Sequence, residues 1–293
     1  SPKEFPHLTG LKGRTLLTSD GTTILGADDK AGIAEILTMI ERIQTENRPH
    51  GTICVAFTPD EEIGMGAEHF NLDQFGAEYA YTLDGDSEGE IQYENFNACK
   101  AEFEIRGFNV HPGEGKDTMI NASLVAIEIN NCLPSMETPR GTEDYEGFYH
   151  LISMQGEVGE AKLNYIVRDH DKNGFEERKK TLRLIEKNLN AKWGEGTVTL
   201  KITDQYLNMK EIVEEHMHLI DHAKKACEAA GVAPLILPIR GGTDGCQLSF
   251  KGLPCPNLGT GGHAFHGPYE HISVEGMEKS VELLLALIQE YTK

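Results

Sequence analysis

Hydrophobic residues in the first part of the chain gather in short runs, and each run ends at acidic residues. The apolar and β-branched run at residues 52–58 predicts a strand buried on both faces of a parallel sheet, and it stops at Pro59-Asp60-Glu61-Glu62. A second run, at residues 77–83, predicts a short strand that ends at Asp84. Both predicted strands therefore carry acidic side chains at their C-terminal ends.

A helix is predicted ahead of these two strands. Leu25 leads through Gly26 to Asp28, and apolar residues then recur at helical spacing as far as Asn47, before a break at Pro49. The recurring apolar residues are Ile33, Ile36, Leu37, Ile40 and Ile43. Asp28 is therefore expected at a junction between a strand and a helix.

The acidic residues at these junctions are expected to lie close together. In open α/β sheets, ligands bind in the crevice beyond the carboxyl ends of the parallel strands. The alternative is that acidic residues follow strands only because loops are solvated, which explains any one of them but explains the whole set less well. The residues expected in one crevice are Asp28, Glu61, Glu62 and Asp84.

From about residue 100 the pattern changes to that of a second domain. The predicted elements are a strand at 101–105, a helix at 119–131, strands at 147–154 and 161–167, a helix at 174–190 and a strand at 197–203. This βαββαβ order is that of a ferredoxin-like module. Helices at 211–230 and 274–291 follow it. We therefore expect an α/β domain of sheet and helices (residues 1–95 and 208–293), interrupted by an inserted ferredoxin-like α+β domain at 96–207.

Composition argues against several classes of partner. The 293 residues carry a formal net charge of −20, which disfavours nucleic acids and anionic membranes because both are bound by clustered Lys and Arg. Small substrates and metal cations suit an acidic protein better. The six cysteines form no CxxC pair, which favours reduced thiols and a cytoplasmic location. Every apolar run is too short to span a bilayer.

The acidic residues, together with His266, have the chemistry of a hydrolytic metal site. Zinc accepts carboxylate and imidazole ligands, and a two-metal site needs one carboxylate that bridges both ions. Four motifs resemble the metal-site motifs of the co-catalytic zinc exopeptidases, a family that includes carboxypeptidase G and the aminoacylases, and the resemblance extends over nearly the whole chain. The motifs are Gly26-Ala-Asp-Asp-Lys-Ala-Gly32, Pro59-Asp-Glu-Glu-Ile-Gly64, Thr82-Leu-Asp-Gly-Asp86 and His266-Gly-Pro-Tyr-Glu270.

The resemblance implies a role for each of these residues. It makes Asp28 the carboxylate that bridges two zinc ions. Glu62 and His266 are then ligands of one ion, and Asp84 is a ligand of the other. Glu61 becomes the general base, since a carboxylate that binds no metal can take a proton from an activated water. For the two adjacent glutamates, the alternative is a solvated acidic turn.

The other histidines have weaker support as site residues. His111, in Asn109-Val-His-Pro-Gly113, resembles the family histidine that reaches across the cleft to polarise the scissile carbonyl group. The alternative for His111 is a structural role in a turn before proline. His263 and His271 flank His266 but lack its H-G-x-x-E context, and we expect them to be bystanders.

Three further stretches resemble the substrate-binding stretches of the tripeptide aminopeptidases within this family. A guanidinium group binds a carboxylate in a bidentate manner, which suits recognition of the C-terminus of a peptide. The resemblance therefore implies hydrolysis of the N-terminal residue from small peptides, and it allows a homodimer formed through the inserted domain. The residues in these stretches are Arg168, Asn121 and Arg240.

One family motif is absent from the chain. The family's first zinc histidine belongs to a His-x-Asp motif upstream of the bridging aspartate, and none of the twelve histidines is followed two residues later by aspartate. We therefore expect this chain to lack an upstream segment, to bind one or two zinc ions and to be inactive by itself. The alternatives are another amide hydrolase of the family, such as a dipeptidase or an N-acyl amino acid deacylase, and a non-catalytic fragment.

Overall fold

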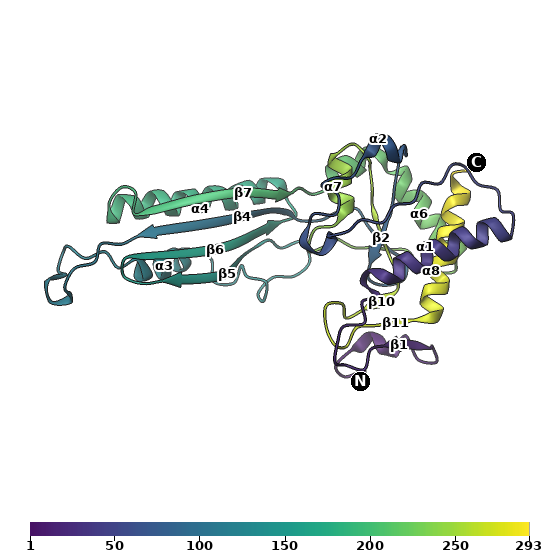
Figure 1. The fold of residues 1–293 in the computed structure, drawn as a ribbon, viewed down its shortest axis with the longest axis horizontal. Helices are drawn as coiled ribbons and strands as arrows, with labels where there is room; N and C mark the ends of the chain where they lie inside the picture. Colours follow the sequence, from purple (N-terminus) through teal and green to yellow (C-terminus); the bar gives the residue numbers. More distant parts are fainter. Residues whose placement is uncertain (293) are drawn as a thin grey trace. The chain divides into compact units, whose positions relative to one another are not determined.

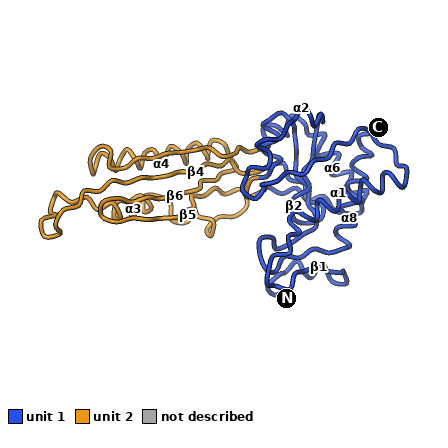
Figure 2. Tube along the Cα trace, in the orientation of Figure 1, with its two compact units in different colours: residues 1–94, 209–239, 243–293 blue, residues 95–208, 240–242 orange. Residues whose placement is uncertain are grey.

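The structure is a computed structural model that describes residues 1–292. The chain divides into two compact units, coloured separately in Figure 2. Residues 1–94, 209–239 and those from 243 onward form the first unit, and residues 95–208 with 240–242 form the second. Within residues 1–292, no helix combines the length and the apolar character needed to cross a membrane.

The first unit contains two small sheets (Figure 1). In the larger sheet, with strand order β2-β9-β3-β8, β2 runs parallel to β9, β9 antiparallel to β3, and β3 parallel to β8. These strands are Thr82–Gly85 (β2), Glu90–Gln92 (β3), Leu235–Ile236 (β8) and Asn257–Gly259 (β9). The smaller antiparallel sheet, in the order β1-β11-β10, comprises Leu16–Thr18 (β1), Gly262–His263 (β10) and His271–Ser273 (β11).

Three longer helices pack together in the first unit. Helix α8 (Val274–Glu290) packs against both α1 (Ala27–Thr45) and α6 (His218–Ala229). The N-terminus of α8 is capped by Ser273, whose hydroxyl accepts the Gly276 N–H at 3.0 Å. The predicted helix at 211–230 is instead divided by a 3-10 turn, Glu214–His216. The shorter helices are α2 (Leu72–Phe75), α5 (Lys210–Val213) and α7 (Asp244–Phe250).

The predicted strand at residues 52–58 is wrong. No strand forms there, and no strand within residues 1–292 pairs with this segment. Val55 and Phe57 are 38% and 49% exposed. The physical reason is that apolar residues favour burial, whereas a strand also needs a neighbouring backbone to complete its hydrogen bonds. The second predicted strand forms later than expected, as β2, and contains Asp84.

The second unit is an antiparallel sheet with the strand order β5-β6-β4-β7 and two helices. This order, with the chain sequence βαββαβ, confirms the predicted ferredoxin-like module. Strands and helices share one core, in which Phe103, Tyr165 and Leu182 are fully buried. Its elements are β4 (Asn97–Arg106), α3 (Ala122–Asn131), β5 (Phe148–Gly156), β6 (Glu160–Asp169), α4 (Lys172–Trp193) and β7 (Val198–Tyr206).

Asparagine side chains connect the two ends of the second unit. The backbone N–H of Asn95 donates a hydrogen bond to Asn208 Oδ1 at 3.0 Å, and the backbone N–H of Asn208 donates one to Asn97 Oδ1 at 3.0 Å. Asn97 Nδ2 also donates to the carbonyl oxygens of Asp169 and His170, each at 3.1 Å. The chain therefore enters and leaves this unit through one buried polar junction, which we call the asparagine junction.

Helix α1 buries a carboxyl group that has no hydrogen-bond partner. Glu35 is 1% exposed, and neither of its carboxyl oxygens has a partner among residues 1–292. Burial, followed by the charge of Asp29, raises the pKa of Glu35 from 4.5 to about 10. The folded state holds the Glu35 proton more tightly than the unfolded state does. The contribution of this proton to the free energy of unfolding is therefore fully present below about pH 4.5 and is lost as the pH rises towards 10.

We therefore expect Glu35→Met to stabilise the first unit by about 1–3 kcal/mol at pH 8, and by less at pH 5. Methionine fills a similar volume without an ionisable group. Urea unfolding of both proteins at the two pH values measures the difference. Glu41→Met, on an exposed position of the same helix, is the control. An equal gain at both pH values, or no gain at pH 8, would contradict the expectation.

Candidate metal centre

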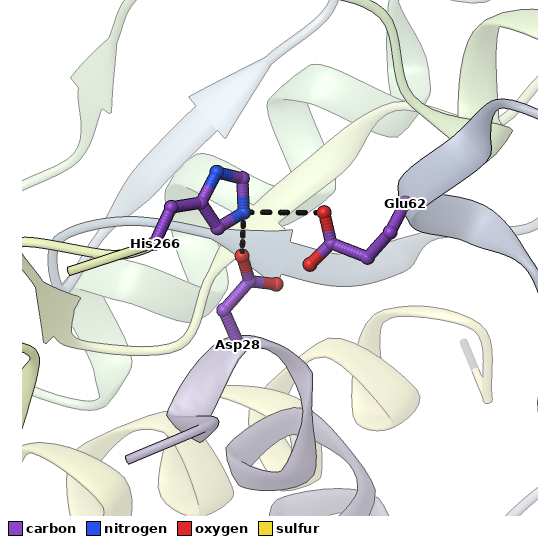
Figure 3. Close-up of side chains that lie close together, drawn as sticks. All are labelled: Asp28, Glu62 and His266. Atoms are coloured by element: carbon purple, nitrogen blue, oxygen red, sulfur yellow. Dashed lines mark hydrogen bonds and ion pairs between the residues drawn. The ribbon is translucent and has the colours of Figure 1, made fainter. Parts of the chain in front are cut away.

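Three side chains from separate segments of the first unit bring ligand atoms together (Figure 3). His266 Nε2 lies 2.9 Å from Asp28 Oδ2 and 3.2 Å from Glu62 Oε2. The three ligand atoms all lie within 4.8 Å of one another. Asp28 is at the start of α1, Glu62 is in the 3-10 turn Glu61–Ile63, and His266 is in the loop between β10 and β11. Two carboxylates and one imidazole form a donor set that fits zinc.

The backbone at the start of α1 departs from helical geometry and directs Asp28 into this cluster. Gly26 is left-handed, with φ +70° and ψ +35°, and Asp28 has φ −82° and ψ +105°. The buried carboxylate of Glu270 accepts the Gly26 N–H at 2.6 Å and the Asp28 N–H at 3.1 Å. With this backbone, the Asp28 side chain points toward His266 (Figure 3).

Left-handed backbone also surrounds the other two ligands. Asp60 (φ +62°) and Gly64 (φ +72°) enclose the turn that carries Glu62. His266 itself has φ +59°, and Ala264 has φ +57°. Left-handed geometry is unfavourable for a residue with a Cβ atom, so it persists only where neighbouring contacts hold it. The backbone at or next to each of the three ligand residues is therefore held in place by the surrounding fold.

Carboxyl groups crowd around the cluster and raise one another's pKa values. Burial, and then neighbouring carboxylates with Asp29 first among them, raises the pKa of Asp84 to about 9. Burial, and then carboxylates beginning with Asp244, raises the pKa of Glu61 to about 7. The pKa of Asp29 rises to about 8, mainly through burial. A bound dication relieves such repulsion, so the electrostatics of the site favour a metal ion.

The imidazole of His266 experiences opposing influences. Burial lowers its pKa, but the carboxylates of Glu62 and Asp28 raise it, and the net pKa lies above the ordinary value. A protonated imidazole offers no lone pair to a metal. Metal binding at this cluster must therefore release a proton.

Two further predicted residues lie beside Asp28. The charge of Asp28 raises the pKa values of both Glu61 and Asp84, so Asp28 lies close to both carboxyl groups. Asp28 thus pairs with His266 and lies close enough to Asp84 for its charge to raise the pKa of Asp84. In the part of the chain that the structure describes, no second group of three ligand atoms converges on Asp84.

The remaining predicted site residues belong to the second unit; they are His111, Asn121, Arg168 and Arg240. His111 is exposed, and its Nδ1 accepts the Gly113 N–H at 3.2 Å, so a neutral ring carries its proton on Nε2. Asn121 caps helix α3, where its Oδ1 accepts the Leu124 N–H at 3.3 Å.

Arg168 has acceptors within the sheet of the second unit. The residue is 9% exposed, and its Nη1 donates to the carbonyl oxygens of Cys99 and Val167 and to Oε1 of Gln205. Its guanidinium also lies 5.1 Å from the ring centroid of Tyr206. These contacts give Arg168 a structural role, and its part in substrate binding stays a prediction.

Arg240 holds the loop at residues 142–146. Its Nη1 donates to the carbonyl oxygens of Asp144 at 2.6 Å and Glu146 at 3.1 Å, and its Nη2 donates to Thr142 Oγ1 at 3.0 Å. The guanidinium also lies 5.1 Å from the Phe96 ring centroid. The structure thus shows a side chain that anchors a loop, and a role in substrate binding stays a prediction for Arg240 as well.

Replacing Arg240 with alanine is expected to release this loop. Amide exchange at residues 142–146 should become faster, and the second unit should lose about 1–3 kcal/mol of stability, because charged hydrogen bonds and a cation–π contact disappear. Arg140→Ala removes the same charge from a nearby exposed position and serves as the control. Equal exchange rates in the two variants would show that Arg240 does not anchor the loop.

Two buried carboxylates of the site were not predicted from the sequence. Asp244, the first residue of α7, is 4% exposed, and neither of its oxygens has a partner among residues 1–292. Gly66 packs directly against this carboxylate, where a Cβ atom would overlap it. Glu270 is the final residue of the motif that contains His266, so its position was visible in the sequence but its contacts were not.

Converging carboxylates and a histidine in an α/β unit are typical of metal-dependent hydrolases. The chain belongs to Peptidase family M20/M25/M40, whose family model matches residues 21–290. It is therefore a peptidase, and the family predicted from its motifs is confirmed.

Individual relatives narrow this assignment. Peptidase T of Halothermothrix orenii is 54% identical over 292 residues, which is 99% of this chain and 72% of that protein. Among solved structures, aminopeptidase PepT from Bacillus cereus matches with a TM-score of 0.83 and 28% identity, over 95% of this chain and 74% of that one. A Bacillus subtilis dinuclear metal-binding peptidase from the M20 family shares the fold, with a TM-score of 0.68 and 16% identity over 89% and 71% of the two chains.

Proposed function

We propose that this chain is a zinc-dependent aminopeptidase that removes the N-terminal residue from tripeptides. The observation that carries the proposal is the convergence of Asp28, Glu62 and His266, because it places a zinc donor set in a chain 54% identical to a Peptidase T. The free thiols found at all six cysteines suit the cytoplasmic location that we also propose.

Two zinc positions share Asp28 in this proposal. Glu62 and His266 hold one ion together with Asp28, and Asp84 contributes to the other. The position of Asp28, paired with His266 and close to Asp84, supports its role as the bridging carboxylate. When bound, the two ions supply an acidified water and a Lewis acid for the scissile carbonyl group.

Glu61 is the proposed general base. It lies next to a ligand but outside the group of three converging side chains, and it is half-buried. Its carboxylate takes a proton from the attacking water and delivers it to the nitrogen of the leaving amine.

Residues of the second unit are proposed to bind the peptide. The proton on Nε2 of His111 suits donation to the developing oxyanion of the scissile carbonyl group. Arg168 is proposed to bind the C-terminal carboxylate through Nε and Nη2, because the acceptors seen in the described residues engage Nη1. Asn121 and Arg240 are also proposed to bind the peptide substrate.

Binding of matched peptides to the zinc-loaded protein tests the substrate class. We expect a tripeptide to bind roughly 10–150-fold more tightly than its C-terminal amide, since a charged hydrogen bond contributes about 1.5–3 kcal/mol. Dipeptides, tetrapeptides and N-acyl amino acids complete the panel, and titration calorimetry gives the affinities. Stronger binding of N-acyl amino acids, or binding that does not depend on zinc, would contradict the proposal.

The expectation that the chain is inactive by itself stays a prediction. Its physical basis is that the Asp84 side of the site lacks a second converging ligand group among the described residues. Turnover of a tripeptide by these 293 residues with excess zinc would contradict it.

A further inference from the structure

A buried carboxylate links the backbone of one proposed metal ligand to the loop of another. Glu270 is 1% exposed, and its two oxygens accept the N–H groups of Gly26 at 2.6 Å and Asp28 at 3.1 Å. In the part of the chain that the structure describes, these two backbone N–H groups are its side-chain partners. Its charge is therefore satisfied by backbone N–H groups alone.

This contact replaces a missing cap at the start of α1. Gly26 occupies the N-cap position and has no side chain that could accept a hydrogen bond. The first N–H groups of a helix have no partners within the helix and favour an anionic acceptor. Glu270 supplies that acceptor from a distant segment. It binds the N–H groups of Gly26 and Asp28, where the backbone turns the Asp28 side chain toward His266.

The other end of the contact lies in the His266 loop. Glu270 is four residues beyond His266. The backbone N–H of Glu270 donates to the Gly267 carbonyl oxygen at 3.2 Å, which closes a tight turn between Gly267 and Glu270. Directly after Glu270, strand β11 pairs with both β1 and β10, so this side of the loop is fixed to the sheet. Ala264 and His266 keep their left-handed geometry within this closed loop.

We infer that Glu270 is a positioning residue that holds the Asp28 turn and the His266 loop in register, so that the two ligands are already paired before a metal ion arrives. The inference rests on the proposed zinc site. It adds that the affinity of the site depends on a carboxylate that touches neither the ion nor the substrate. Groups that orient metal ligands commonly change metal affinity by about 10–100-fold when they are replaced.

The first test compares zinc affinity in Glu270→Gln and a matched control. Competition with a chromophoric chelator should show about 10–100-fold weaker zinc binding in Glu270→Gln, because the amide nitrogen of glutamine opposes one of the two backbone donors. Glu275→Gln is the control, since both oxygens of Glu275 likewise accept a backbone N–H, that of Thr15, at 3.1 and 2.8 Å. The control should bind zinc as the wild type does.

A second variant separates positioning from charge. Glu270→Asp keeps the negative charge but shortens the side chain, so it should also weaken zinc binding. Wild-type affinity in Glu270→Asp would mean that only the charge matters and would overturn the inference, as would wild-type affinity in Glu270→Gln. If the wild-type protein itself binds no zinc, the proposed metal site fails and this inference fails with it.

Hydrogen exchange in the zinc-free wild type provides a test that does not depend on how the variants fold. The amides of Gly26 and Asp28 should exchange slowly before any zinc is added, because Glu270 already accepts both. Fast exchange of both amides in the zinc-free protein, followed by protection on zinc addition, would show that the metal builds the arrangement and would overturn the inference.

Discussion

In an enzyme whose second zinc position is completed by the family's His-x-Asp motif, Glu61→Gln is expected to lower kcat by about 10²–10⁴-fold while leaving the zinc content unchanged. Glutamine keeps the size and shape of the side chain but cannot take the proton of the attacking water. Glu61 lies outside the group of converging ligand atoms, so its loss should not release metal. Release of the N-terminal amino acid measures kcat, and elemental mass spectrometry measures zinc.

The matched comparison is Glu62→Gln, in the same turn. Glu62 Oε2 lies 3.2 Å from His266 Nε2, so this variant should lose zinc and regain part of its activity in excess zinc. Excess zinc should not restore Glu61→Gln. A near-normal kcat in Glu61→Gln would remove the base assignment, and loss of zinc from that variant would make Glu61 a ligand.

Asp28→Ala is expected to weaken zinc binding at both positions. Asp28 Oδ2 lies 2.9 Å from His266 Nε2, and Asp28 also lies close to Asp84, so removal of this proposed bridging ligand takes a ligand from each side of the site. Zinc stoichiometry across a range of free zinc concentrations measures the effect. Glu62→Gln should weaken only one position, which makes the two profiles distinguishable.

Asp73→Ala removes a carboxylate of the same unit at an exposed position and should keep the wild-type zinc profile. It controls for the change in net charge. Two tightly bound zinc ions in Asp28→Ala would rule out a bridging carboxylate at this position.

The second unit was the part of the fold best predicted from sequence. Its strands alternate buried and exposed positions and its helices have one apolar face, so local patterns alone located each element. The first unit depends on pairing between short strands far apart in the sequence, such as β2 with β9. Local patterns carry no information on such partners, which is why the prediction of a strand at residues 52–58 was wrong.

The candidate site was located through an argument that was only partly correct. Glu61 and Glu62 were placed beside Asp28 as residues at the end of a sheet strand, yet they follow a segment that has no strand partner in the described residues. Their position comes instead from a tight turn flanked by left-handed residues. The contact of Glu270 with Gly26 could not be predicted, because it joins two segments that only the folded chain brings together.

The asparagine junction has a consequence for the order in which the protein folds on the ribosome. It lets residues 95–208 close on themselves as a nearly continuous segment, whereas α1 must wait for α8, which is translated after that entire segment. Nascent domains generally fold as soon as they have been synthesised. The buried face of α1, including Met39 and Ile43, is therefore exposed throughout the interval in which the second unit is made. We expect this helix to be where chaperones engage the growing chain.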